Sequence, residues 1–225
     1  MKRIIIAGTA GVGLLICGLQ AQRTVPDSVS PGAQPQATGK VPESVGAIAI
    51  LRWYAANLTT SFPSGSGPQG IAFDGANVWI ANANSNNVTE LRASDGGLVG
   101  TFTVGTNPFG VAFDGANIWV TNKSSNNVTK LQASTGDTLG TFSVGTFPTG
   151  VAFDGSNLWV ANLLSNNVTE LRASDGAVLG TFSVGTFPTG VAFDGSHIWI
   201  TNQSSNNVTE LLASNGSVVG TFSVG

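Results

Sequence analysis

The sequence predicts an all-β protein, a β-propeller built from four-stranded blades, and three observations support this fold class. First, the segment Pro-x-Gly-(Ile/Val)-Ala-Phe-Asp-Gly recurs every 40 residues, at Pro68, Pro108, Pro148 and Pro188. Second, each copy holds four short strand patterns separated by turn residues, and no copy shows a helical period. Third, a repeat of about 40 residues is typical of solenoids, propellers and arrays, and four strands per repeat match one propeller blade.

The third copy illustrates the four expected strands. Residues 150–153 form the first, which ends at Asp154-Gly155, a strong hairpin signal. Residues 158–161 are apolar on both faces, as expected for a strand buried between neighbouring blades. Residues 168–173 have mixed faces, and residues 178–184 alternate imperfectly, with threonine and serine toward water. We therefore expect one antiparallel four-stranded sheet in each copy.

The repeat sets the domain boundaries. We place the propeller domain at residues 47–225, with full repeats at 67–106, 107–146, 147–186 and 187–225 and a half repeat at 47–66. The half repeat keeps the register, because Leu51 stands 40 residues before Leu91. It corresponds to the third and fourth strands of a blade, so we predict a partial blade that packs beside the first full one as a cap. Propellers usually have about 4 to 8 blades, so the units form either a small closed ring or an open, incomplete one.

The N-terminal segment predicts export. Met1-Lys2-Arg3 is positively charged, an apolar stretch follows, and Ala21 precedes a plausible cleavage point, so residues 1–21 read as a signal peptide. Cys17 follows a sequence similar to a bacterial lipobox, which leaves lipidation at Cys17 as the alternative. Residues 22–46 are rich in Pro, Gln and Ser and predict a flexible linker. We expect a secreted or periplasmic protein without a transmembrane segment after processing.

Composition excludes several classes of function. Charged residues make up 9% of the chain and the net charge is −3, so no basic footprint for nucleic acid is present. The sequence has one cysteine and one histidine, which removes most metal sites and any catalytic constellation that needs several such residues. We expect no cofactor.

Several conspicuous residues recur once per blade. We interpret them as packing or turn-forming residues rather than as binding or catalytic residues. The tryptophans at positions 79, 119, 159 and 199 predict packing between blades rather than a sugar platform. The aspartates precede glycine in hairpin turns, although a closed propeller would gather them into a ring that is a weak candidate for a cation; they are Asp74, Asp114, Asp154 and Asp194. His197 replaces an asparagine of the other blades and is expected to be a turn variant.

Positions that differ between copies predict a binding surface. In a propeller, the link between blades and the loop between the second and third strands open on one face, and repeat proteins build recognition surfaces by varying one face of a constant framework. We expect ligand contacts from Gln69, Phe109, Lys123, Thr149, Leu163, Leu164, Thr189 and Gln203. Leu163 and Leu164 are conspicuous because the equivalent loops are polar or small. No carboxylate occupies these loops, which disfavours acid–base hydrolysis there.

Trp119-Val120-Thr121-Asn122 resembles the motif that names the YVTN β-propeller repeats, with tryptophan in place of tyrosine. The Ser-Asn-Asn-Val-Thr stretch that follows is similar to that family and to its NHL and streptogramin-lyase-like relatives. The resemblance covers about residues 50–225 and implies a propeller, whose members include binding proteins and enzymes alike. It implies histidines in particular blades for lyase-like members and carboxylates around calcium for lactonase-like members, and neither set is found in this sequence.

Three hypotheses of function follow. The first is an exported, non-catalytic propeller that binds a protein, a glycan or an envelope component through its variable loops. The second is a lyase- or lactonase-like enzyme, which we disfavour because almost every polar residue is repeated in all copies. The third is a purely structural repeat or a fragment of a longer propeller. An incomplete ring would also favour self-association that completes the propeller.

Overall fold

The computed structural model of the protein describes residues 61–224, which form sixteen β-strands in four sheets. Each sheet holds four consecutive strands in antiparallel order, and we number the sheets as blades 1 to 4. Blade 1 contains β1 (Pro68–Phe73), β2 (Asn77–Asn82), β3 (Asn87–Arg92) and β4 (Leu98–Thr103); blade 2 contains β5 (Pro108–Phe113), β6 (Asn117–Asn122), β7 (Asn127–Gln132) and β8 (Thr138–Ser143); blade 3 contains β9 (Pro148–Phe153), β10 (Asn157–Asn162), β11 (Asn167–Arg172) and β12 (Val178–Ser183); and blade 4 contains β13 (Pro188–Phe193), β14 (His197–Asn202), β15 (Asn207–Leu212) and β16 (Val218–Ser223). The prediction of an all-β fold with four full four-stranded blades is confirmed.

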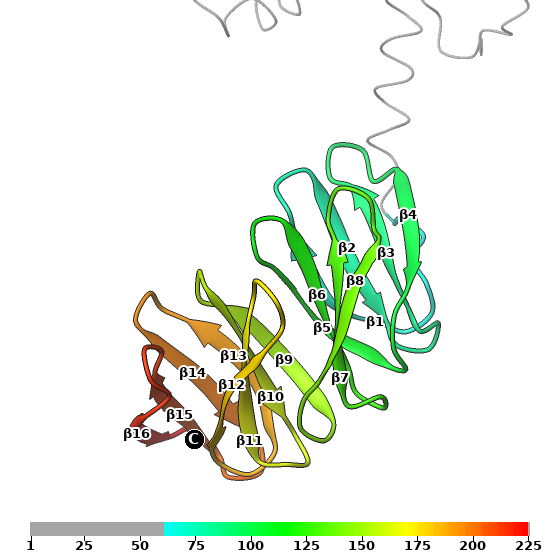
Figure 1. Ribbon diagram of the computed structural model, residues 1–225. Helices are drawn as coiled ribbons and strands as arrows, with labels where there is room; N and C mark the ends of the chain where they lie inside the picture. Colours follow the sequence, from blue (N-terminus) through cyan, green and yellow to red (C-terminus); the bar gives the residue numbers. More distant parts are fainter. Residues whose placement is uncertain (1–60, 225) are drawn as a thin grey trace, which may run out of the picture. The chain divides into compact units, whose positions relative to one another are not determined.

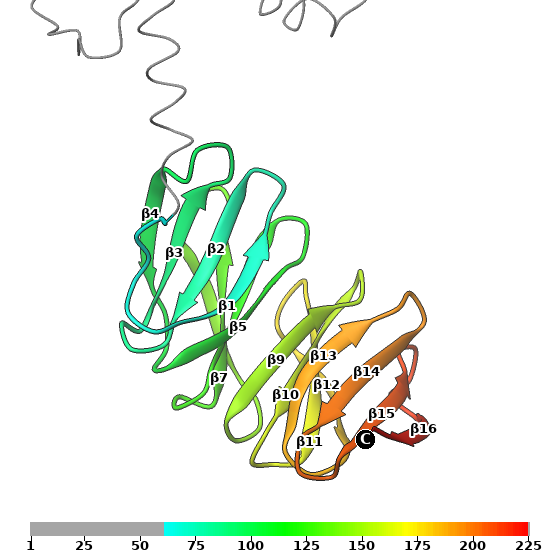
Figure 2. The same cartoon turned by 180° about the vertical axis from the view of Figure 1, so that it is seen from behind.

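The first strands of the blades lie side by side: β1 beside β5, β5 beside β9, and β9 beside β13 (Figures 1 and 2). Glycine makes this close approach possible, because a Cβ on Gly110 would overlap the carbonyl oxygen of Thr149 in the next blade. Within residues 61–224, β13 and β1 stand at opposite ends of the series and do not meet (Figure 1). The four described blades are thus arranged as an open arc.

The turns within each blade follow from turn-forming residues. In blade 3, Asp154 Oδ1 accepts hydrogen bonds from the backbone N–H groups of Ser156 (2.8 Å) and Asn157 (2.7 Å). Gly155 adopts a φ of +99°, a value that L-residues avoid. At the other end of the sheet, Asn166 turns the chain between β10 and β11 with a φ of +55°, and asparagine tolerates this left-handed conformation better than most residues. The hairpins are therefore encoded locally.

Asparagines also tie the strands together. Asn162, at the end of β10, donates from Nδ2 to Asn167 Oδ1 and to Thr169 Oγ1, both at 2.8 Å. The same pair of bonds occurs in every blade, from Asn82, Asn122 and Asn202. The repeated asparagines thus close the loop between the second and third strands of each blade.

The core lies between blades rather than within them. Trp119 is fully buried and packs with Leu158 and Val160 of blade 3. Its ring centroid lies 5.6 Å from that of Phe142 on the outer strand of its own blade. Trp79 and Trp159 are buried in the same way, so the packing interpretation of these tryptophans is confirmed. Each blade needs its neighbour to cover its apolar face.

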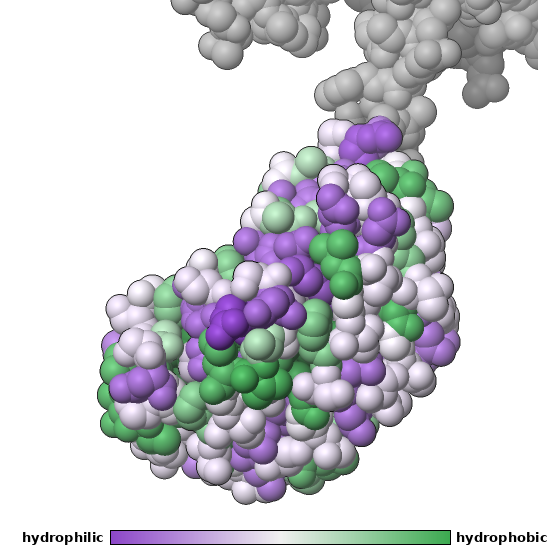
Figure 3. Space-filling model, viewed as in Figure 1, coloured by the Kyte–Doolittle hydropathy of each residue, from purple (hydrophilic) through white to green (hydrophobic). Residues whose placement is uncertain are grey.

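The outer strands leave apolar side chains exposed. Val178 and Leu179 of β12 are 55% and 43% exposed, and Figure 3 shows apolar side chains over this part of the surface. Phe182 of the same strand instead packs toward Trp159 with 5.5 Å between ring centroids. The imperfect alternation predicted for this strand is confirmed, because its register with β11 shifts between Glu170 and Leu171 and the adjacent Val178 and Leu179 are both exposed.

The segments predicted as signal peptide and linker, and most of the predicted half repeat, lie outside the described residues. Phe62 is described, and its ring lies where a Cβ on Gly96 of blade 1 would be. Phe102 of blade 1 bears the same relation to Gly136 of blade 2. Phe62 therefore occupies the place of an outer-strand phenylalanine of a preceding blade. Between residues 61 and 224, the structure has no helix that could span a membrane.

Candidate functional site

The variable positions lie partly in the link between blades and partly in the loop between the second and third strands. These two segments meet at one edge of each blade. Strand pairing places the start of the first strand beside the end of the second, as in Pro108 opposite Asn122. The backbone N–H groups of Lys123 and Ser124 then donate to the carbonyl oxygens of Asn107 (3.0 Å) and Thr106 (3.1 Å). Equivalent pairs of bonds occur in the other three blades. We call this edge the loop edge; it holds the link between blades and the loop between the second and third strands together.

Side chains fix the loop edge from blade to blade. Asn126 Oδ1 accepts a hydrogen bond of 2.9 Å from the backbone N–H of Phe147, which lies in the link to the next blade. Asn86 and Asn166 make the same bond to Asn107 and Phe187. Ser165 Oγ accepts from the backbone N–H of Thr146 at 2.7 Å. The variable side chains thus project from a constant hydrogen-bonded framework.

Lys123 lies among aromatic side chains at this edge. Its Nζ stands 3.3 Å from the ring centroid of Phe109 and 5.2 Å from that of Phe147, within the range of cation–π attraction. Burial lowers the pKa of Lys123. The structure therefore brings together two expected site residues, Lys123 and Phe109, with one that was not expected, Phe147.

The other expected residues differ in accessibility. Leu164 is 51% exposed, and Gln69 and Gln203 are also exposed, whereas Leu163 and Thr189 are partly buried. Thr149 corrects the expectation: it is 1% exposed, and its Oγ1 lies 3.2 Å from the carbonyl oxygen of Ala161 and 3.1 Å from that of Pro188. A side chain held inside the blade junction does not reach a ligand, so Thr149 is left out of the candidate surface.

Phe147 and Phe187 were missed by the sequence reasoning. Both have a left-handed backbone, with φ of +58° and +55°, which is unusual for a bulky residue and stores strain. Phe187 is 38% exposed. The signal was available, since the equivalent positions are Gly67 and Asn107, residues that tolerate this conformation.

The aspartates of the hairpin turns serve the fold. Each aspartate accepts a hydrogen bond from a tryptophan indole, as Asp114 Oδ2 does from Trp119 Nε1 at 2.7 Å. Burial alone would raise the pKa of Asp114, but the bonds from Trp119, Asn117 and the backbone outweigh it, and the pKa is lowered. Within residues 61–224, no three side chains of metal-binding type come together. The turn interpretation therefore accounts for both carboxylate oxygens of Asp114.

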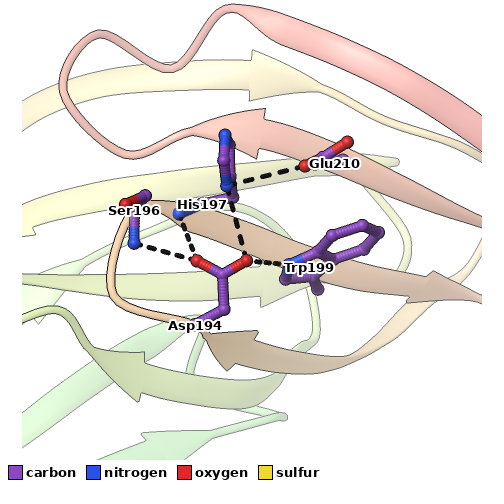
Figure 4. A network of polar contacts seen from close by, with 5 residues as sticks. All are labelled: Asp194, Ser196, His197, Trp199 and Glu210. Carbon is purple, nitrogen blue, oxygen red and sulfur yellow. Dashed lines mark hydrogen bonds and ion pairs between the residues drawn. The ribbon is translucent and has the colours of Figure 1, made fainter.

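His197 lies in a network with two carboxylates (Figure 4). Its Nδ1 stands 3.4 Å from Asp194 Oδ2 and 3.6 Å from Glu210 Oε1. The contact with Glu210 was not expected. In blades 1 and 3 an asparagine at the same position donates to the equivalent glutamate, as Asn157 Nδ2 does to Glu170 Oε1 at 2.8 Å. His197 thus replaces an asparagine in the same hairpin network, as expected of a turn variant.

Hydrogen bonds fix the ionisation of Asp194. The indole of Trp199, first, and then the backbone N–H groups of His197 and Ser196 hold the pKa of Asp194 far below its ordinary value. The ionised form of Asp194 is therefore favoured by the same hydrogen bonds that close the hairpin.

An acidic cleft of about 480 Å³ lies between blades 3 and 4. Its walls include Asp154 and Glu170 of blade 3 and Ala213 and Ser214 of blade 4. At the junction of blades 2 and 3, Lys130 stands at the position of Glu170. Its Nζ donates hydrogen bonds to the carbonyl oxygens of Ala173 (2.7 Å) and Ser174 (3.3 Å). The cleft lies at the hairpin ends of the blades, opposite the loop edge.

The repeat, the four-stranded blades and the packing between them define a β-propeller repeat protein. No family model matches the sequence, and no curated protein matches it. Solved structures with the same fold include hydrazine synthase of Kuenenia stuttgartiensis, with a TM-score of 0.64 and 23% identity over 73% of this chain and 51% of that one.

Two lyases share the fold as well. A streptogramin B lyase has a TM-score of 0.60 and 22% identity over 71% of this chain and 55% of that one. Virginiamycin B lyase from Staphylococcus aureus has a TM-score of 0.60 and 18% identity over 71% of this chain and 56% of that one. This chain therefore spans about half the length of the solved chains that it matches.

Proposed function

We propose that the protein is an exported, non-catalytic propeller that binds a protein, a glycan or an envelope component through its loop edge. One observation carries the proposal: five apolar side chains stand at loop-edge positions where other copies have small, polar or charged residues. They are Phe109, Phe147, Leu163, Leu164 and Phe187. They come from three consecutive blades, and the backbone bonds between loops hold them at the same edge.

The chemistry of this edge suits recognition. Aromatic side chains supply large contact area at low entropic cost, and they are enriched in interfaces and stack on sugar rings and peptide groups. Lys123, set between Phe109 and Phe147, adds one positive charge to the apolar surface. A partner with an apolar face and a nearby acidic group would match this arrangement.

Catalysis is less well supported. The one histidine of the described residues, His197, repeats the role of an asparagine at the opposite ends of the strands. Asp74, Asp114, Asp154 and Asp194 all accept tryptophan and backbone hydrogen bonds. No observation favours a lyase or lactonase mechanism over the binding role.

Binding is tested with the purified protein against isolated cell-envelope material and an array of glycans. We expect the double variant Leu164→Asp, Phe187→Asp to lose binding by about 10-fold or more, because it places charge in the apolar contact. Val178→Asp is the matched control, since Val178 is 55% exposed but lies on an outer strand. Equal binding by all three proteins would contradict the proposal for the loop edge.

Export is tested separately by N-terminal sequencing of the protein from the extracellular or periplasmic fraction. We expect a mature N-terminus at Gln22, after cleavage of residues 1–21. An intact Met1 in that fraction would refute the signal peptide, and a lipidated Cys17 would replace secretion by membrane anchoring.

A further inference from the structure

Every junction between blades is built from the same two faces. The forward face of a blade packs onto the rear face of the next one. At the junction of blades 1 and 2, the forward face consists of Ala72, Trp79, Ala81, Val88, Phe102 and Val104, and the rear face consists of Val111, Phe113, Ile118, Val120, Leu131 and Ala133. The equivalent residues form the two other junctions. The described residues therefore contain three copies of one apolar interface.

The forward face of blade 4 has no partner among the described residues. Phe222 and Val224 are 47% and 49% exposed, whereas the equivalent Phe182 and Val184 of blade 3 pack against blade 4. Trp199 is half-buried, although the other three blade tryptophans are fully buried. A large aromatic surface that elsewhere forms the core thus faces solvent.

Among residues 61–224, the rear face of blade 1 also lacks a blade packed on it. Ile71 is 65% exposed, and its equivalent Val111 in blade 2 is 9% exposed. Phe73 is 58% exposed, whereas Phe113 packs against blade 1. The two ends of the arc therefore present the two complementary halves of the interface that the chain already forms three times.

We propose that two copies of the chain associate head to tail, with the forward face of blade 4 of each copy packed on the rear face of blade 1 of the other. Continuity with the internal junctions supports this occupant, since the end faces carry the same residue types in the same register. Contacts of this heterologous kind close into a ring when the rotation permits. The described residues of two copies supply eight blades, which lies within the usual range of about 4 to 8 for propellers.

Phe62 occupies a position that the second copy needs for association. At an internal junction, the outer-strand phenylalanine of one blade lies over a glycine of the next, as Phe182 does over Gly216. The equivalent place on blade 1 is Gly96, and Phe62 of the same chain occupies it. Phe222 of a second copy must displace Phe62 to complete the junction. Phe62 therefore competes with the second copy for one end of the interface.

The mass of the full-length mature protein in solution tests the proposal, by sedimentation velocity over a concentration series. We expect a concentration-dependent species of twice the chain mass. Phe222→Asp and Ile71→Asp should each weaken association by about 10- to 100-fold, because a charge in an apolar interface is costly. Val178→Asp, at a similarly exposed site away from both end faces, should associate like the wild type. Phe62→Ala should associate more tightly.

Mixing the two disrupted variants tests the head-to-tail geometry. A chain with Phe222→Asp keeps an intact rear face, and a chain with Ile71→Asp keeps an intact forward face. The mixture should therefore form one junction and give a heterodimer that neither variant forms alone. A wild-type protein that remains monomeric up to high concentration would overturn the proposal. A dimer that Phe222→Asp disrupts and Ile71→Asp leaves intact would show symmetric pairing of forward faces and overturn it as well.

Discussion

The indole Nε1 of Trp159 donates a hydrogen bond of 2.6 Å to Oδ2 of Asp154, five residues earlier in the chain. The other oxygen of the same carboxylate accepts two backbone bonds that close the hairpin between β9 and β10. One aspartate therefore fixes both the turn and the orientation of the largest core side chain. The bond recurs in all four blades, so turn formation and blade packing are coupled throughout the arc.

Replacing Trp159 by alanine tests the contribution of the blade junction to stability. We expect the free energy of unfolding to fall by about 3–5 kcal/mol, because a fully buried indole leaves a cavity and Asp154 loses a donor. Trp199→Ala is the matched control: it makes the same bond but is half-buried at the end of the arc. Denaturant unfolding of dilute protein should show a smaller loss for Trp199→Ala; equal losses would mean that burial between blades is not the source of stability.

Acid should weaken the fold through the hairpin aspartates. The pKa of Asp114 is lowered in the folded state, so its ionised form stabilises the fold above the unfolded pKa of about 3.9, and this contribution is lost as pH falls through the lower folded pKa. Asp114→Asn cannot titrate. We therefore expect its free energy of unfolding to depend less on pH between about pH 5 and pH 2 than that of the wild type.

A second aspartate of blade 2 provides the control for that measurement. Asp137 is exposed, and its carboxylate accepts no hydrogen bond from residues 61–224. Asp137→Asn removes a carboxylate without removing a hydrogen bond that it accepts, so it should alter the acid dependence less than Asp114→Asn does. A slope altered equally by both substitutions would show that net charge, rather than the hydrogen bonds of Asp114, governs acid unfolding.

Glu170 predicts the opposite dependence on pH. Burial, first, and the charge of Asp154, second, raise the pKa of Glu170, although the bond from Asn157 opposes them. A raised folded pKa means that the charged form costs stability, so the free energy of unfolding falls as pH rises from about 4.3 through the folded value. Glu170→Gln keeps an acceptor for Asn157 without the charge. We expect a higher free energy of unfolding than that of the wild type at pH 7, measured by urea unfolding, and a smaller difference below about pH 4.

Glu210→Gln is the contrasting variant. Glu210 occupies the same position in blade 4, but His197 Nδ1 lies 3.6 Å from its carboxylate. Glu210→Gln removes a contact with His197 that Glu170 does not have, so we expect it to gain less than Glu170→Gln does. If both glutamine variants gained equally, the contact with His197 would make no difference, and the burial that both glutamates share would account for the gain.

The fold could be predicted because the same turn and strand signals recur in every 40-residue repeat. The Asp-Gly turns, the apolar second strands and the fixed spacing all concern contacts within one repeat or between consecutive repeats, and the observed strands follow them. Trp119 could be assigned to the core on the same ground. The openness of the arc depended instead on the angle between blades, which no single repeat encodes, so the sequence left a closed ring and an open arc as alternatives.

The candidate surface could be predicted only in outline. Comparison of the copies located the variable loops, and the backbone bonds between Lys123 and Asn107 show that they share one edge. The comparison of the copies could not show that Thr149 is buried in a junction while Leu164 faces solvent, because accessibility depends on the neighbouring blade. Phe147 and Phe187 were overlooked, although Gly67 and Asn107 at the equivalent positions already indicated the left-handed backbone that the structure shows at both phenylalanines.

Gly136 and Gly155 separate two reasons for glycine in this fold. Both have positive φ, at +76° and +99°. A Cβ on Gly155 would meet nothing within 4 Å, whereas a Cβ on Gly136 would overlap the ring of Phe102 from the preceding blade. Gly155→Ala should therefore cost only the backbone strain, about 1–2 kcal/mol. Gly136→Ala should cost about 1–3 kcal/mol more, because Phe102 must leave its place against Trp79.

Urea unfolding of the two alanine variants, followed by tryptophan fluorescence, measures this difference. The double variant Gly136→Ala, Phe102→Ala separates overlap from strain, since removing the ring removes the clash. We expect the double variant to lose less free energy of unfolding than the sum of the two single losses, by about 1–3 kcal/mol. Strictly additive losses, or equal costs for Gly136→Ala and Gly155→Ala, would show that the phenylalanine of one blade does not depend on the bare glycine of the next. The same logic would then fail for Phe62 on Gly96, where an identical arrangement precedes blade 1.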